Sequence, residues 1–318
     1  MDRTQDQADD DGSQLGEGEA GPTAARLLLG AQLRQLREAA GISREDAGYV
    51  IRASGSKISR LELGRVSFKP RDVDDLLDLY GVRDGPARAT LQALGGQSST
   101  PPWWHAFRDA VPDWLEDYLG LEPSASLIRT YDVQFIPALL RTGDYGRAVL
   151  RLSPGDDETA LEQRAGLAEL RQQILYRPDP PRVWAVIDEA ALRRPVGGPT
   201  VMRAQIKHLI QAVRLDHVTI QVMPLSAGHA AAGGPISLLR FSQGGLADVV
   251  YLEQLATGVY LNRPAETTDY WSALNHLATQ ARPPAATPSI LRKILAEDLS
   301  AGRGSSARSN GSINSPDS

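Results

Sequence analysis

The stretch from Gly41 to Arg65, GISREDAGYVIRASGSKISRLELGR, most constrains what this chain can fold into. A serine opens each of two short periodic segments, which is typical of an N-cap. Gly64 stands where a helix commonly ends in a left-handed residue. The pattern therefore predicts one helix from Ser43 to about Ile51 and a second from Ser54 to about Leu63, joined by a tight turn at 52–53.

The second predicted helix has two unlike faces. Ile58, Leu61 and Glu62 share one side, whereas hydroxyls and cations occupy the other. From Arg52 to Arg71 the chain carries six basic residues against Glu62 alone, although its formal net charge is −5. Arginine can address guanine in a bidentate manner, and serine can pair with donors or acceptors in the major groove. The pattern favours a DNA-reading helix, and the alternative is a small helical bundle with a solvated basic face.

The string SKISRLELGR, residues 56–65, resembles the recognition helix and following turn of Cro/repressor-type (xenobiotic-response-element) helix-turn-helix regulators. The resemblance implies a structural role for Glu62 and a small residue, Gly48, where the two helices touch. The turn position that often holds glycine in the family is Arg52 here. We therefore expect a left-handed non-glycine residue, at a cost of about 1 kcal/mol.

Length and composition set the broad class. The 318 residues allow about two domains. The chain has no cysteine, which excludes disulfides and cysteine zinc sites and fits a reducing cytoplasm. No apolar run approaches the ~18 residues that a transmembrane helix needs. We expect a cytoplasmic protein, associated with the nucleoid when it is bound to DNA.

Composition also predicts the domain organisation, which is multidomain. The expected parts are a disordered acidic tail at 1–22, an all-α five-helix domain at 23–96, a linker at 97–102, a mixed α/β (α+β) domain at 103–281, and a mostly disordered tail at 282–318 with a short helix over Ser289–Leu299. In the larger domain we expect strands near 126–131, 183–187, 218–222, 236–241, 249–252 and 258–260.

The larger domain also carries recognisable strings. FIPALLRTGDY (135–145), DEAALRRPVGG (188–198), QVMPLSAGH (221–229) and VVYLE (249–253) resemble the C-terminal domain of a group of actinobacterial Cro-like regulators. Such regulators are often encoded beside a small partner protein. The resemblance implies no agreed ligand or reaction.

Enzymatic motifs are not evident in this domain, so we expect neither catalysis, nor a cofactor, nor a metal. Asp188-Glu189 is more typical of an N-cap with a first-turn acid than of an acid/base pair. His208, His217 and His229 lack metal-ligand spacing. The glycine-rich segment 228–235 fits a loop between strands, or a lid, and matches no phosphate-binding motif. Trp271 is expected in the core or beside an effector pocket.

These observations predict a sequence-specific DNA-binding transcriptional regulator. Its expected partners are double-stranded DNA, a second copy in a homodimer, and a small protein or small-molecule effector sensed by the larger domain. Two alternatives stay open, namely an antitoxin-like interaction module with autoregulatory DNA binding and an enzyme with an appended DNA-binding domain. The predicted DNA contacts are Ser56, Ser59 and Arg60 to bases, Gly55 for close approach, a backbone donor near Ser54, and Arg44, Lys57, Arg65 and Lys69 to phosphates.

Overall fold

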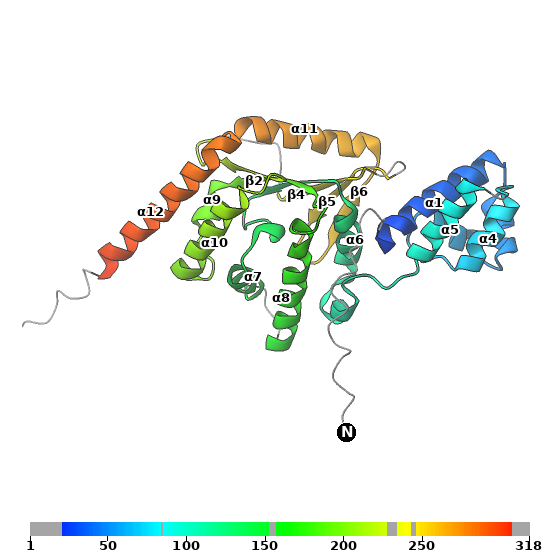
Figure 1. Cartoon of the computed structure of the whole chain (residues 1–318), viewed down its shortest axis with the longest axis horizontal. Coiled ribbons are helices and arrows are strands. Elements are labelled where there is room, and N and C mark those ends of the chain that lie inside the picture. The colour runs from blue at the N-terminus through cyan, green and yellow to red at the C-terminus, as the bar shows by residue number, and fades with distance from the viewer. Residues whose placement is uncertain (1–20, 84, 153–156, 228–233, 243–245, 307–318) are drawn as a thin grey trace, which may run out of the picture.

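A computed structural model describes residues 21–83, 85–152, 157–227, 234–242 and 246–306. A bundle of helices lies at one end of the molecule, and a layered domain built on a mixed sheet forms the rest (Figure 1). This confirms the predicted order of an all-α domain followed by a mixed α/β domain. The expected acidic tail, His229 with most of its glycine-rich loop, and the last residues of the chain lie outside the described residues.

The bundle has the five predicted helices. Both predicted serine caps are present, since Ser43 Oγ accepts from the Asp46 amide at 3.0 Å and Ser54 Oγ accepts from the Lys57 amide at 3.2 Å. Buried apolar residues from every helix form one core. The helices are α1 (Pro22–Ala39), α2 (Arg44–Val50), α3 (Gly55–Glu62), α4 (Pro70–Leu79) and α5 (Pro86–Gln97).

The turn between α2 and α3 has the expected strained residue. Arg52 has a φ of 54°, in the left-handed region, as predicted. Gly48 is needed for the close contact, because a Cβ there would lie 2.6 Å from the carbonyl oxygen of Ala53. Gly64, with a φ of +65°, ends α3, and the Arg65 amide donates to the carbonyl oxygen of Arg60 at 2.9 Å.

The larger domain is built on a six-stranded sheet in the order β3-β2-β1-β4-β5-β6. The first three strands are parallel, and the others pair antiparallel, so that Thr130 of β1 lies between Ala185 of β2 and Ser237 of β4. All the expected strands are found. They are β1 (Leu127–Asp132), β2 (Arg182–Asp188), β3 (Val218–Met223), β4 (Ile236–Arg240), β5 (Val249–Glu253) and β6 (Gly258–Leu261).

Helices cover both faces of this sheet. Residues such as Ala185 and Ile220 pack with Leu209 and Ile294 in the main core, and their neighbours on the strands, such as Val186, pack on the other face against α11 (Figure 1). The helices are α6 (Asp113–Leu121), α7 (Gly143–Leu150), α8 (Glu158–Gln172), α9 (Glu189–Arg193), α10 (Gly198–Ala212), α11 (Pro264–Gln280) and α12 (Thr287–Ser306). Short 3₁₀ turns lie at His105–Ala110, Glu122–Ser124, Ala138–Leu140, Gln173–Leu175 and Pro284–Ala286.

The last helix corrects a prediction. The expected helix Ser289–Leu299 begins at Thr287 instead and continues to Ser306. Leu291 and Ile294 are buried in the main core beside α10, so this helix docks on the body of the protein. Apolar spacing indicated its inner face, but the polar composition of the end of the chain concealed its length.

The first helix belongs to both parts of the molecule. Leu29 and Leu33 pack in the bundle, whereas Ala24, near the start of the same helix, is fully buried in the core of the sheet domain. The amide of Gly21 donates to Ser124 Oγ at 3.0 Å. In the predicted linker, Ser98 is buried, and the Ser99 hydroxyl donates to the carbonyl oxygen of Phe68 at 2.8 Å. The bundle and the sheet domain are therefore packed together.

Candidate nucleic-acid interface

Helix α3 is fixed to the bundle by its inner face. Ile58 and Leu61 are buried in the bundle core. Glu62 is also buried and accepts from Arg37 of α1 through two contacts, Nε to Oε1 at 2.5 Å and Nη2 to Oε2 at 3.1 Å. The hydrogen bond that Arg37 donates to Glu62 raises the pKa of Arg37, against the effect of desolvation. These contacts support the structural role expected for Glu62, and they set the orientation of α3.

The outer face of α3 carries the side chains predicted to read bases. Ser56 and Arg60 are exposed, and Ser59 is half-buried. Within the described part of the chain, none of the three makes a side-chain hydrogen bond or ion pair. Their polar groups are therefore not used to hold the fold, and they are available to a ligand.

The four predicted phosphate contacts fall into two pairs. Arg65 and Lys69 are exposed and have no ion-pair partner among the described residues. Lys57 Nζ lies 3.2 Å from Asp72 Oδ2, and Arg44 Nε lies 3.4 Å from Glu62 Oε2. The positive charges of Lys57 and Arg44 are therefore partly balanced within the protein, whereas those of Arg65 and Lys69 are not. The sequence did not reveal this difference.

The start of α3 adds detail to the sequence interpretation. A Cβ at Gly55 would lie 2.6 Å from Glu45 Oε1, the end of an exposed and flexible side chain that can move aside, so packing against α2 does not by itself require this glycine. The Ser54 hydroxyl is used as the N-cap. The Lys57 amide belongs to this cap, so in the first turn the amides of Gly55 and Ser56 remain as donors for an anion.

One exposed residue beside the turn was missed. Tyr49, in the last turn of α2, is 86% exposed. Its neighbours Ala47 and Gly48 are buried, so helical spacing in the sequence could have placed Tyr49 on the exposed side of α2. An exposed phenol can donate to a phosphate or pack on a sugar, and Tyr49 is therefore a candidate contact at the edge of this surface.

The comparisons with known proteins agree with this geometry. A helix-turn-helix domain model matches residues 28–91, which supports DNA as a partner. The family described as "Domain of unknown function (DUF5753)" matches residues 115–293, more than half of the chain. The chain belongs to the DUF5753 family. No curated protein and no solved structure matches it.

The DUF5753 domain buries several charged groups. Arg171 contacts Glu122 through Nε to Oε2 at 2.5 Å and Nη2 to Oε1 at 2.7 Å, and its guanidinium lies 5.0 Å from the ring centroid of Tyr118. Burial raises the pKa of Asp132, at the end of β1, to about 6, although the charge of Arg141 lowers it. Arg171 and Glu122 are therefore paired with each other, and the charge of Arg141 acts on Asp132.

The aromatic cluster around Trp271 has an internal explanation. The guanidinium of Arg129 lies 4.7 Å from the Trp184 ring and 4.9 Å from the Trp271 ring, and Arg240 lies 4.1 Å from Trp271. Trp271 Nε1 also donates to Asp248 at 2.7 Å. The cluster therefore belongs to the packing between the DUF5753 sheet and α11.

The remaining predicted sites of the DUF5753 domain can be placed in turn. Asp188 caps α9 by accepting from the Ala190 amide at 2.9 Å, as the N-cap interpretation predicts. Burial lowers the pKa of His208. No group of three or more His, Cys, Asp or Glu side chains in the described ranges is arranged to hold a metal ion. None of the helices in those ranges is long and apolar enough to cross a membrane.

Proposed function

We propose that this protein is a sequence-specific transcriptional regulator of the actinobacterial Cro/repressor-like group, and that α3 enters the major groove of its operator. One observation carries the proposal. The inner face of α3 is locked to the bundle by Ile58, Leu61 and the Arg37–Glu62 pair. On its outer face, Ser56, Ser59 and Arg60 have no internal side-chain partner in the described chain. A rigid helix with free donors is what direct base reading requires.

The proposed contacts follow from this division. Arg60, Ser56 and Ser59 contact base edges. Arg65 and Lys69 hold phosphates, and Lys57 and Arg44 add weaker attraction because their charges are shared with internal carboxylates.

The remaining parts of the proposal concern the whole protein. One short helix reads few base pairs, so we propose a homodimer that binds two half-sites about 34–36 Å apart. The DUF5753 domain responds to a small partner protein or a small ligand and has no catalytic role. The protein acts in the cytoplasm, on DNA of the nucleoid.

The test is selection of bound fragments from genomic DNA by the purified full chain at physiological salt. We expect one enriched motif. An Arg60→Ala variant should lose about 1–3 kcal/mol of binding free energy and relax the preference at one base position. Arg263→Ala removes the same charge from a side chain that is 81% exposed at the start of α11 and should leave the motif unchanged.

Two outcomes would count against the proposal. Salt-sensitive binding without any motif would reduce the role of α3 to electrostatic attraction. An equal loss in Arg60→Ala on all sequences would make Arg60 a phosphate contact.

A further inference from the structure

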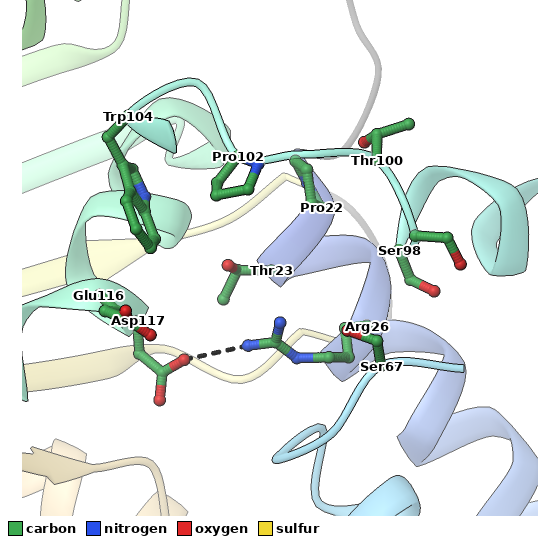
Figure 2. Close-up of a pocket in the computed structure, with 11 residues that line it drawn as sticks. Pro22, Thr23, Arg26, Ser67, Ser98, Thr100, Pro102, Trp104, Glu116 and Asp117 are labelled. Carbon is green, nitrogen blue, oxygen red and sulfur yellow. Dashed lines mark hydrogen bonds and ion pairs between the residues drawn. The ribbon is translucent and has the colours of Figure 1, made fainter. Parts of the chain in front are cut away.

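A polar pocket of about 200 Å³ lies at the junction between the helix-turn-helix bundle and the DUF5753 domain (Figure 2). Its walls come from the start of α1, the loop between α3 and α4, the segment that joins the two parts, and α6. An engineered protein cavity of ~150 Å³ accepts benzene, so the pocket has room for a molecule of about that size. Any molecule bound here would touch both parts of the protein.

The charged groups of this pocket leave one carboxylate unbalanced. Arg26 is already used twice, since Nη2 lies 3.1 Å from Asp117 Oδ1 and Nε donates to the carbonyl oxygen of Gly64 at 2.5 Å. Glu116 is half-buried and has no hydrogen-bond or ion-pair partner within the described residues. Burial raises the pKa of Glu116, and the nearby charges of Asp113 and Asp117 raise it further, whereas the charge of Arg26 lowers it. The pocket therefore favours a positive charge beside Glu116.

Three of the hydroxyl groups that line the pocket donate their hydrogens within the protein and can therefore accept from a ligand. Ser98 Oγ donates to the carbonyl oxygen of Gly95 at 2.8 Å, and Ser99 Oγ donates to that of Phe68 at 2.8 Å. Thr100 Oγ1 donates to the carbonyl oxygen of Gln97 at 2.8 Å. The hydrogens of these hydroxyls are used inside the protein, and their oxygen lone pairs remain. A ligand rich in donors complements such a lining.

Trp104 supplies the aromatic wall. The residue is 6% exposed, lines the pocket, and its Nε1 is buried without a hydrogen-bond partner in the described structure. A buried donor without an acceptor costs about 1–3 kcal/mol. Aromatic rings also attract organic cations, most strongly tryptophan. A ring beside an unbalanced carboxylate is a suitable environment for an ammonium group that also carries an acceptor atom.

We propose that this junction pocket is a binding site for a small organic cation, namely an amine that also carries a hydroxyl or carbonyl group. The ammonium group contacts Glu116 and the hydroxyl oxygens, and the second group of the ligand meets the indole N–H of Trp104. This site differs from the DNA surface and from the cluster around Trp271.

The same pocket is connected to the recognition helix. Arg26 joins Asp117 on α6 to the carbonyl oxygen of Gly64, the residue that ends α3. A cation placed near Asp117 competes with Arg26 for that carboxylate, so occupancy of the pocket acts on the end of α3. This coupling, unlike the binding itself, rests on the proposed DNA-binding function.

The test uses the indole N–H signals of the full chain in NMR spectra, with the Trp104 signal assigned by Trp104→Phe. The probe is ethanolamine, and ethylene glycol is its neutral counterpart of nearly the same shape. We expect ethanolamine to shift the Trp104 signal in a saturable manner and ethylene glycol to shift it little. Glu116→Gln should weaken the binding about tenfold or more, whereas Glu158→Gln, on the exposed surface of α8, should not change it. The other indole signals report whether each variant remains folded.

Each of the other outcomes decides for or against a stated part of the proposal. No saturable shift, or an equal shift with ethylene glycol or acetate, would overturn the cation site, whatever the protein does with DNA. Unchanged binding in Glu116→Gln would place the amine elsewhere. If the Trp104 signal shifts as expected and DNA affinity changes by about fivefold or more with ethanolamine, the coupling is supported. If DNA binds but its affinity stays constant, the coupling is overturned while the site stands.

Discussion

At the scale of single residues, Arg52 carries strain that the fold imposes on it. It is the non-glycine residue with positive φ in the described chain, and the left-handed conformation costs an L-residue about 1–2 kcal/mol. Replacing it with glycine removes this strain but adds flexibility to the unfolded chain. We therefore expect Arg52→Gly to stabilise the helix-turn-helix by about 0.5–1 kcal/mol, measured by amide hydrogen exchange of α2 and α3 without DNA. Arg52→Ala removes the same side chain and keeps the strain, so an equal gain in that variant would contradict this explanation.

Glu62 shows the opposite case, a polar residue that the core cannot lose alone. Its pair with Arg37 is buried on both sides, with side-chain exposures of 4% and 8%. Removing one charge leaves the other buried and uncompensated, which typically costs about 3–5 kcal/mol. We expect Glu62→Gln to lower the free energy of opening of α1 and α3 by that amount in hydrogen exchange. Asp75→Asn breaks the exposed pair with Arg71 on α4 and serves as the control, with little expected change.

At the scale of elements, the cations around α3 should contribute unequally to DNA binding. Arg65 is free among the described residues, whereas Lys57 is paired with Asp72 at 3.2 Å. A free cation at a phosphate releases a counterion on binding, so its loss lowers the slope of log affinity against log salt by about 1. We expect Arg65→Ala to weaken binding on all sequences with that change in slope. Lys57→Ala should change both quantities less, and an equal effect of the two substitutions would show that the Lys57–Asp72 pair opens on DNA.

The sequence predicted the elements of the helix-turn-helix well because its local signals agree. The serine caps, the glycine that ends α3 and the apolar spacing of Ile58 and Leu61 each act within a few residues. The candidate site was less predictable. Lys57 pairs with Asp72, which lies 15 residues further along the chain, and Arg44 pairs with Glu62, which lies 18 residues further along. The sequence likewise predicted a short helix at 289–299 without showing where it docks, because the burial of Leu291 depends on the distant α10.

At the scale of the whole molecule, the connection between the two domains was the least predictable feature. Residues 97–102 have the composition of a linker, yet Ser98 is buried and α1 extends from one core into the other. The contact between α1 and the sheet domain depends on two small residues. Gly120 allows the close approach of Thr23, and Ala24 is buried in the core of the sheet domain. A helical pattern shows which face is apolar, but it does not show that two ends of that face meet different domains. The consequence is that α1 transmits the position of the DUF5753 domain to the bundle.

This rigid junction can be tested at Gly120. A Cβ there would lie 2.0 Å from Thr23 Oγ1 and 2.5 Å from Thr23 Cβ, so even alanine must displace the start of α1 from α6. Nothing lies within 4 Å of the Cβ position of Gly146, which makes Gly146→Ala the matched helical control. We expect Gly120→Ala to let the two domains tumble separately in ¹⁵N relaxation, with each domain still folded, and Gly146→Ala to retain a single correlation time. A single correlation time in both variants would mean that the packing of α1 in the two domain cores holds the domains together without the close contact at Thr23.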